Sequence, residues 1–360
     1  MKQKLFEDFD KVDKKHWLEK ATTDLKGANP QEKYGWQIED GIRLDLYYDK
    51  SDTKNLSTSF QNRQYVADHP SGHIRHWDNL QEVLVDDDKK ANKVALEALE
   101  GGAEGLIFKL KNQDVDYNVL LKDIQLAFCS VWFDVSSSKS TETAINCLEN
   151  LKPQTGGLII DDINAIQTLQ LHLPKNSQLK IALTLPITNK SLSEKIAAFL
   201  EIAIECVEHT DESILKRLSF QYPLGTDFFG EIAAMRALRQ LYFQIIKAYK
   251  IEDNLPEDLH LMGVSTAWSN EDYNPHANML KSTTAGMAAV LGGCDSLLVE
   301  PENNEKPYMT RVARNVSNIL KEESYFNSNA DPVAGSYYLE SLTDTLAKEA
   351  WSLFQQKIDK

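Results

Sequence analysis

The chain has 360 residues, of which 42% are hydrophobic and 26% charged, a composition typical of a globular protein and unlike that of disordered or fibrous chains. Asp and Glu outnumber Lys and Arg by 54 to 39, and the resulting formal charge of -15 disfavours nucleic acid or an anionic membrane as a partner. The first residues lack an apolar signal core, and no run approaches the ~18 apolar residues of a membrane span, so we expect a cytoplasmic protein.

Residues 1–75 form an aromatic-rich N-terminal arm without an apolar pattern that could build an independent core. Its aromatic residues stand among polar ones and include Trp17, Tyr34, Trp36, Tyr47 and Tyr48. Such an arm needs a surface to pack on. We therefore expect it to contact either the wall of the main domain or a partner subunit.

From residue 76 onward the sequence alternates short apolar runs with amphipathic stretches, the pattern of a parallel sheet with crossover helices. We predict strands at residues 80–85, 105–110, 126–135, 157–161, 179–187, 218–224, 259–268 and 295–299. Helices are predicted to follow them. The first two cover residues 89–99 and 115–124, the third and fourth end near residues 151 and 171, and the fifth and sixth begin after Ser191 and Asp227. The last two cover residues 275–291 and 308–323.

Two of these helices have specific start signals. Ser191 and Glu194 form a capping box, and Asp227 precedes a long apolar stripe. Eight strand–helix units in a row favour closure into a (β/α)8 TIM-type barrel, because an open sheet of that width leaves two exposed edges. An open doubly wound sheet is the structural alternative. A last helix over 339–358 is predicted to cover the barrel exterior, so that residues 76–360 form one domain.

The cysteines and histidines do not form a metal-binding pattern. No C-x-x-C pair occurs among Cys129, Cys147, Cys206 and Cys294, which we interpret as buried apolar thiols. Three histidines fall in the segment H-P-S-G-H-I-R-H, at His69, His73 and His76. Pro70 and Gly72 prevent them from sharing one helix face, so no metal ligand set is predicted there.

Four stretches carry a family resemblance. They read L-S-F-Q-Y-P-L-G-T-D-F-F-G-E from Leu218, N-P-H-A-N-M-L-K-S-T-T-A-G from Asn274, R-V-A-R-N-V-S-N-I-L from Arg311 and D-P-V-A-G-S-Y-Y-L-E from Asp331. Together and in this order they resemble methylmalonyl-CoA mutase subunits. The segment W-L-E-K-A-T-T-D-L-K-G from Trp17 is similar to the opening of small subunits of bacterial heterodimeric mutases.

The resemblance implies an adenosylcobalamin-dependent enzyme complex that interconverts methylmalonyl-CoA and succinyl-CoA. In that family a (β/α)8 barrel holds the acyl-CoA, and a C-terminal flavodoxin-like domain holds the corrin. This sequence stops one predicted helix after the barrel, at Lys360. We therefore expect no corrin domain, no cofactor bound by this chain, and adenosylcobalamin in a homologous large subunit.

One short motif has to be weighed against that expectation. The corrin domain supplies its cobalt ligand from Asp-x-His-x-x-Gly, and Asp258, His260 and Gly263 match this pattern here. The match opens a predicted barrel strand instead of following one, so we interpret it as a coincidence and His260 as an ordinary strand-start residue.

The catalytic residues that the resemblance implies are missing. Where the family has Gly-Tyr-His after the fifth strand, residues 183–187 of this chain read L-T-L-P-I. No Arg or Lys occurs between Leu255 and Asn278 to hold a substrate carboxylate. The tyrosine-rich loop before the first strand is replaced by D-H-P-S-G-H, residues 68–73. We therefore predict no catalytic residues in this chain.

Polar residues nevertheless stand near the predicted C-terminal strand ends, where barrel enzymes place their sites. A vestigial pocket at the barrel mouth would use Asp134, Thr184, Gln221, Ser265, Thr266 and Glu300, with Asp161 nearby. Solvated loop residues are the simpler interpretation. Four arginines are predicted on the outside of the helices, in salt bridges or partner contacts: Arg236, Arg239, Arg311 and Arg314.

Three functions remain open from the sequence. The first is a non-catalytic small subunit that supports a homologous catalytic large subunit. The second is an acyl-CoA-binding isomerase barrel that works with a separate cobalamin-binding protein. The third is a regulatory subunit that binds acyl-CoA or another effector.

Overall fold

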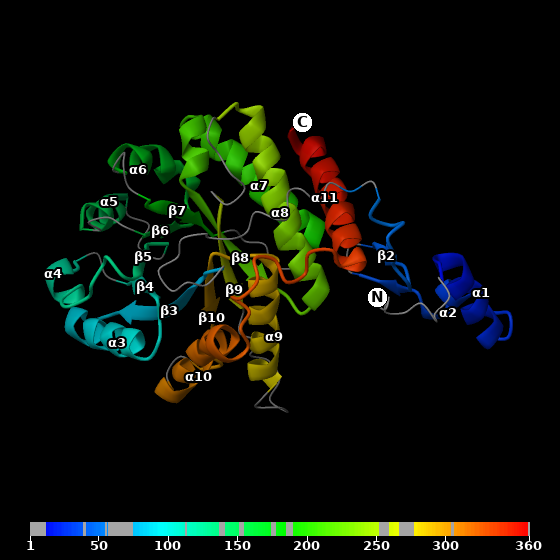
Figure 1. The fold of residues 1–360 in the computed structure, drawn as a ribbon. Coiled ribbons are helices and arrows are strands. Elements are labelled where there is room, and N and C mark those ends of the chain that lie inside the picture. The colour runs from blue at the N-terminus through cyan, green and yellow to red at the C-terminus, as the bar shows by residue number, and fades with distance from the viewer. Residues whose placement is uncertain are drawn as a thin grey trace, which may run out of the picture.

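A closed barrel of eight parallel strands forms the centre of the molecule, with helices around it (Figure 1). The computed structural model describes residues 12–38, 41–54, 56, 75–111, 114–136, 141–150, 155–173, 178–184, 190–251, 259–265, 277–303 and 306–358. In order around the barrel the strands are β3 Asp78–Val85, β4 Gly105–Leu110, β5 Ser130–Asp134, β6 Gly156–Ile160, β7 Lys180–Leu183, β8 Leu218–Leu224, β9 His260–Ser265 and β10 Ser296–Val299. β10 pairs with β3 and closes the barrel. The predicted (β/α)8 barrel is confirmed.

The helices that cover the barrel follow the strands along the chain. They are α3 Asp88–Glu100, α4 Tyr117–Leu120, α5 Thr141–Asn150, α6 Ile166–His172, α7 Leu192–His209, α8 Phe228–Ala248, α9 Ala277–Gly292 and α10 Pro307–Asn318. Short 3-10 turns η2 Ile163–Ala165 and η3 Glu212–Lys216 stand before α6 and β8, and a π-helical turn η5 Ile319–Glu323 ends α10. The helix predicted over 115–124 is only the single turn α4.

Capping fixes where the two best-predicted helices begin. The Ser191 side chain accepts from the backbone N–H of Glu194, and the Glu194 carboxylate accepts from the N–H of Ser191, which is the predicted capping box. Asp227 accepts from the N–H of Gly230 at the start of α8. Both helices then bury a broad apolar face on the barrel.

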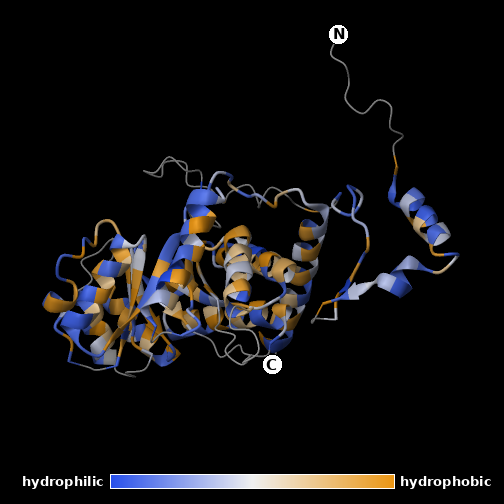
Figure 2. Cartoon of the chain, turned by 90° about the horizontal axis from the view of Figure 1, so that it is seen from below, coloured by the Kyte–Doolittle hydropathy of each residue, from blue (hydrophilic) through white to orange (hydrophobic). Residues whose placement is uncertain are grey.

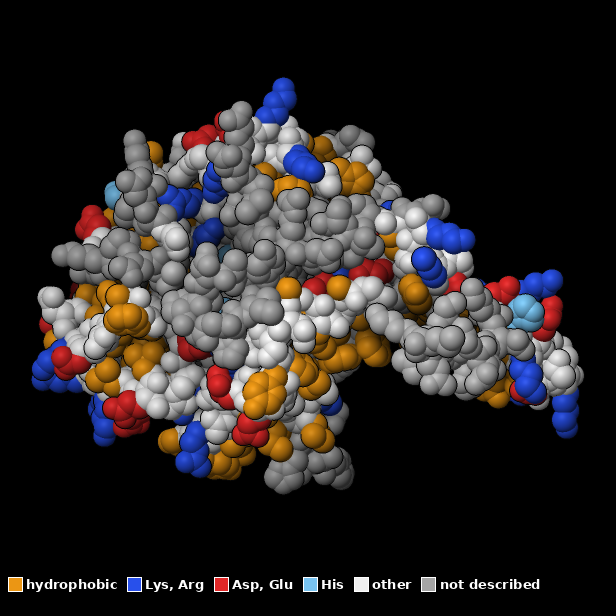
Figure 3. All heavy atoms as spheres, viewed as in Figure 1, with side chains coloured by type: hydrophobic (Ala, Val, Ile, Leu, Met, Phe, Trp, Pro, Cys, Tyr) orange, Lys and Arg blue, Asp and Glu red, His pale blue; other side chains and the backbone are white. Residues whose placement is uncertain are grey.

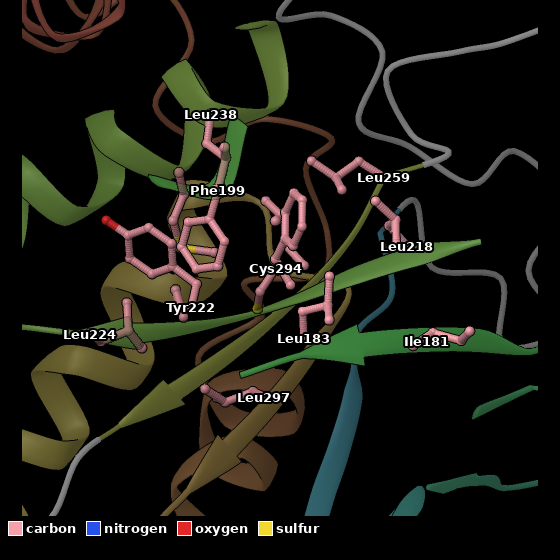
Figure 4. Packing of buried hydrophobic residues seen from close by; sticks show 14 of the residues in the cluster. Ile181, Leu183, Phe199, Leu218, Tyr222, Leu224, Leu238, Leu259, Cys294 and Leu297 are labelled. Carbon is pink, nitrogen blue, oxygen red and sulfur yellow. The ribbon is translucent and has the colours of Figure 1, made fainter. Parts of the chain in front are cut away.

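The main core lies between the outer face of the barrel and these helices. Phe199 of α7 packs on Phe220 and Tyr222 of β8, with ring centroids 4.8 and 5.8 Å apart. Figure 4 shows the Phe199 and Tyr222 rings close to Leu238 of α8 in the layer between strand and helix. All of these side chains are fully buried, so this layer holds α7 and α8 against the sheet.

The strand β6 begins at a point of close backbone approach. Gly156 has a φ of +114°, and a Cβ placed there would lie 2.0 Å from the carbonyl oxygen of Val131 on β5. Only glycine fits such a position without displacing the neighbouring strand. The G-G pair before L-I-I is therefore required by the barrel geometry.

The arm and the last helix lie together on one side of the barrel (Figures 1 and 2). The arm contains α1 Lys14–Asp24, α2 Pro30–Tyr34 and a small antiparallel pair, β1 Trp36–Gln37 and β2 Arg43–Leu44. The last helix, α11 Tyr337–Ile358, packs on α7 and α8. Tyr48 of the arm contacts Tyr338 of α11, with ring centroids 5.2 Å apart, whereas α1 buries none of its residues.

Candidate functional site

The interior of the barrel is filled by apolar side chains. Successive strand residues point to opposite faces, and one residue from each of seven strands meets the others inside: Leu80, Ile107, Trp132, Ile159, Ala182, Met262 and Leu298. Each is at most 5% exposed. Trp132 is the largest of them, and the set forms a plug across the barrel axis.

Below this plug, at the N-terminal end of the strands, lies a polar floor. The Nδ1 atom of His260 lies 2.7 Å from the hydroxyl oxygen of Ser219 on the neighbouring strand. The imidazole of His260 packs against the ring of Trp132, with ring centroids 5.2 Å apart. Burial lowers the pKa of His260, so this ring is neutral at pH 7. Asp78 lies 3.1 Å from the Nε2 atom of His76.

The same floor holds an ionised carboxylate. Burial alone would raise the pKa of Asp78, but the hydrogen bond from His76 opposes it, and the pKa is held below its ordinary value. His76 therefore has a structural partner. The other two histidines of its segment, His69 and His73, lie outside the described residues.

His260 does not fit the role of a cobalt ligand. It is the first residue of β9, and Gly263 of the same motif lies in the middle of that strand, so the motif forms no loop after a strand. One ring nitrogen faces Ser219, and one side of the ring is covered by Trp132. A corrin ring cannot approach an imidazole held in this way, which agrees with its interpretation as a strand-start residue.

At the opposite, C-terminal end, the mouth of the barrel has a paired lysine. Lys109 of β4 lies 3.4 Å from a carboxylate oxygen of Glu82 on β3, and it stands in register with Asp134 on β5. The Asp134 carboxylate accepts hydrogen bonds from the backbone N–H and the hydroxyl of Ser136, at 3.0 and 2.5 Å. The ammonium of Lys109 is thus paired with the Glu82 carboxylate of the neighbouring strand.

The structure brings the other predicted mouth residues together in pairs. The hydroxyl of Thr184 donates to the amide oxygen of Gln221 at 2.7 Å. Ser265 is fully buried, and its hydroxyl accepts from the backbone N–H of Glu300 at 3.1 Å. By strand alternation Ser265 points toward the helices, away from the plug, because its neighbour on β9, Val264, packs on the plug.

Two further residues of the predicted mouth contribute less. Thr266 lies outside the described residues, and Asp161 is exposed after β6. The described residues at the mouth are therefore held in separate hydrogen-bonded pairs. Thr184 pairs with Gln221 and Ser265 with Glu300, each across neighbouring strands, whereas Asp134 pairs with Ser136 two residues further along the chain.

Two arginines predicted on the outside are buried, so that part of the prediction is wrong. Arg236 is 4% exposed and forms salt bridges with Asp331 and Glu340, which tie α8 to α11. Arg239 is 3% exposed and pairs with Asp295 below the barrel floor. Their helix α8 is covered by neighbouring helices, and a guanidinium enters such an interface when carboxylates accompany it. The salt bridges themselves were predicted.

The other two arginines lie nearer the surface. Arg311 is exposed on α10, as predicted. Arg314 donates to the carbonyl oxygen of Gly101 and to the side-chain oxygen of Gln81, so it joins α10 to the barrel.

A buried glutamate that the sequence analysis did not identify fixes the loop between β8 and α8. Glu231 is 1% exposed and accepts from Lys195 Nζ at 2.8 Å, Tyr222 OH at 2.7 Å and the Gly225 N–H at 2.6 Å. A glutamate in the first turn of an otherwise apolar helix was the available sequence signal. The network spans β8, α7 and α8 and closes the loop at the mouth end of β8.

The described part of the chain contains no group of three or more His, Cys, Asp or Glu that could hold a metal ion. All four cysteines are buried and free, as predicted. Burial raises the thiol pKa to about 11 for Cys129 and to about 12 for Cys147, Cys206 and Cys294. Among the helices of the described residues, none is long and apolar enough to cross a membrane.

Comparison with known proteins gives sequence matches to methylmalonyl-CoA mutases. The family model described as methylmalonyl-CoA mutase matches residues 190–360. The methylmalonyl-CoA mutase small subunit of Porphyromonas gingivalis is 27% identical over 98% of this chain and 64% of its own length. The large subunit of the same organism is 34% identical over 40% of this chain and 21% of its own length. The mutase of Escherichia coli is 33% identical over 45% of this chain and 24% of its own length.

The chain therefore spans less than two thirds of the length of these relatives. Among solved structures, dihydropteroate synthase from Xanthomonas albilineans is similar with a TM-score of 0.41 and 13% identity, over 70% of this chain and 97% of that one. That likeness is too low to carry an argument. On the family model and the sequence matches, the chain is similar to the methylmalonyl-CoA mutase family.

Proposed function

We propose that the chain is a non-catalytic small subunit that supports a homologous large subunit in the adenosylcobalamin-dependent interconversion of methylmalonyl-CoA and succinyl-CoA. The similarity to a small subunit over 98% of the chain supports the family side of this proposal. The non-catalytic side rests on the packed barrel interior.

The observation that carries the proposal is the plug across the barrel axis. Seven inward side chains, of which Trp132 is the largest, fill the barrel axis, so an acyl-CoA chain could run along this axis only if they moved. At the mouth, Lys109 is paired with Glu82, so a substrate carboxylate would have to compete with that carboxylate for the ammonium. Both features oppose acyl-CoA binding along this axis.

The cofactor is proposed to bind the partner subunit. His260 does not fit a cobalt ligand, because its ring is held by Ser219 and Trp132 at the barrel floor. The radical chemistry that adenosylcobalamin supplies is therefore proposed to take place in the large subunit.

The arm is proposed to be a contact with the large subunit. Helix α1 buries none of its residues, and Leu18 on it is 46% exposed. Trp17 stacks on Tyr47 at 5.2 Å, and Lys14 bonds to Asp45 and Asp52, so the arm has a defined shape before any partner binds. A preformed, exposed helix of this kind gains stability when a partner covers its apolar side.

Co-expression with a full-length large subunit that binds cobalamin tests the proposal. We expect a stable 1:1 complex at micromolar concentration in size-exclusion chromatography. Leu18→Glu in α1 should weaken the complex at least tenfold. Leu171→Glu is the matched control, because Leu171 is 82% exposed on α6, on the opposite side of the barrel (Figure 1). If the two chains elute separately, the small-subunit role is wrong.

A second experiment separates this role from a barrel that binds acyl-CoA itself. Calorimetric titration of the isolated chain with succinyl-CoA and with propionyl-CoA should give no binding heat and no shift in melting temperature. A dissociation constant in the micromolar range would instead support an isomerase barrel served by a separate cobalamin-binding protein.

A further inference from the structure

A pocket of about 210 Å³ lies between α9 and α10, beside the C-terminal end of β10. Val299, Ala313 and Val316 form its apolar base, and Met279 and Tyr308 stand at its sides. Figure 3 shows hydrophobic and acidic side chains side by side on the surface of these two helices. The pocket is separate from the plug inside the barrel, because Val299 belongs to the helix-facing core and not to the plug.

One polar atom in this pocket lacks a partner. Asn278, in the first turn of α9, lines the pocket and is 7% exposed, yet its side-chain oxygen accepts no hydrogen bond. Buried acceptors in native proteins almost always have a donor, and leaving one without a donor costs free energy. The orphan acceptor therefore points to a ligand that brings an N–H or O–H group into the pocket.

The apolar lining indicates what kind of ligand body fits. An apolar cavity of ~150 Å³ accommodates benzene, so this larger space accommodates a ring system of one or two rings. Two thioethers, of Met279 and Met309, and the ring of Tyr308 line it. Thioethers and tyrosine rings make favourable contacts with aromatic groups.

The rim sets the charge that the ligand can carry. Glu300 and Glu302 line the pocket, and none of the described residues around it is basic. An anion would lose its hydration there without gaining a cationic partner. A neutral or cationic ligand avoids that penalty.

We propose that the pocket between α9 and α10 binds a small aromatic molecule of one or two rings that carries one N–H or O–H donor and no negative charge, with Asn278 as the acceptor. This site is independent of the subunit role proposed above. It assigns a ligand class that differs from an acyl-CoA in both size and charge.

The test uses indole and three analogues, titrated into the full chain and followed by calorimetry. We expect indole and tryptamine to bind at millimolar or lower concentration. 1-Methylindole, which has the same rings without the N–H, should bind at least tenfold more weakly, and indole-3-acetate should be weaker still because of its carboxylate. Equal binding of indole and 1-methylindole, or no binding of any probe, would overturn the proposal.

A pair of variants locates the site. Asn278→Leu removes the acceptor at similar volume, so it should raise the melting temperature and abolish the preference for indole over 1-methylindole. Asn315→Leu makes the same change on the exposed face of α10 and should leave both affinities unchanged. If Asn278→Leu leaves the indole preference intact, Asn278 is not the acceptor and the assignment is wrong.

Discussion

Replacing Glu231 by leucine should cost much of the stability of the barrel. The substitution leaves the Lys195 ammonium, the Tyr222 hydroxyl and the Gly225 N–H without their shared acceptor, in a site where Glu231 is only 1% exposed. Removing one member of a buried ion pair typically costs ~3–5 kcal/mol, because the remaining charge stays buried without compensation. We expect a loss in that range in urea unfolding followed by circular dichroism.

A double-mutant cycle separates the charge from the packing. Lys195→Met combined with Glu231→Leu removes both charges, so we expect the double variant to be more stable than Glu231→Leu by at least ~1 kcal/mol. Glu97→Leu is the exposed control: the Lys93–Glu97 pair is 3.8 Å apart on the surface of α3, and its loss should cost ~0.5 kcal/mol or less. The reasoning is refuted if Glu231→Leu costs no more than Glu97→Leu, or if the two changes at 195 and 231 are additive.

Three further predictions concern the barrel interior and the cysteines. Trp132→Ala should cost ~3–5 kcal/mol in urea unfolding, because it opens a cavity in the plug, and a cost below ~1 kcal/mol would mean that the axis is not filled. Burial lowers the pKa of His260 from its ordinary 6.5, so below about pH 6.5 the unfolded chain binds a proton at this histidine more readily than the native chain, and stability falls as the pH drops. His260→Gln should therefore make the melting temperature less dependent on pH between pH 7 and 5. An unchanged pH dependence in this variant would contradict the prediction. The Cys206 and Cys294 thiols, with pKa values of about 12, should resist iodoacetamide at pH 8 in the native protein and react in urea, whereas labelling of the native chain at either position, measured by peptide mass spectrometry, would contradict their burial.

The sequence was most informative where the determinants are local. The capping box of Ser191 and Glu194 and the cap at Asp227 depend on residues three apart, and both are present. Strand and helix periodicity likewise predicted the order of all eight strand–helix units and their closure. The matched stretches gave the family resemblance, because residue identity at many positions is carried by the sequence itself.

Strand ends and helix lengths were less well predicted. The fifth barrel strand was expected over residues 179–187, and β7 ends at Leu183. The helix expected over 308–323 ends at Asn318 and continues as the π-helical turn Ile319–Glu323. Such ends depend on how far the neighbouring elements pair or pack, and this information is not local.

The environment of single side chains was decided by tertiary structure alone. Alternation along a strand gives two faces, but only the closed barrel decides that Trp132 points inside and Ser265 toward the helices. Arg236 was predicted on the outside of its helix, whereas α11 packs on that helix and supplies Glu340 as the partner of Arg236. The orphan acceptor of Asn278 likewise exists only because α9 and α10 meet over β10. The sequence by itself determined the architecture and the family resemblance of this protein, and the packing of distant elements determined which of its polar groups are paired, buried or open to a ligand.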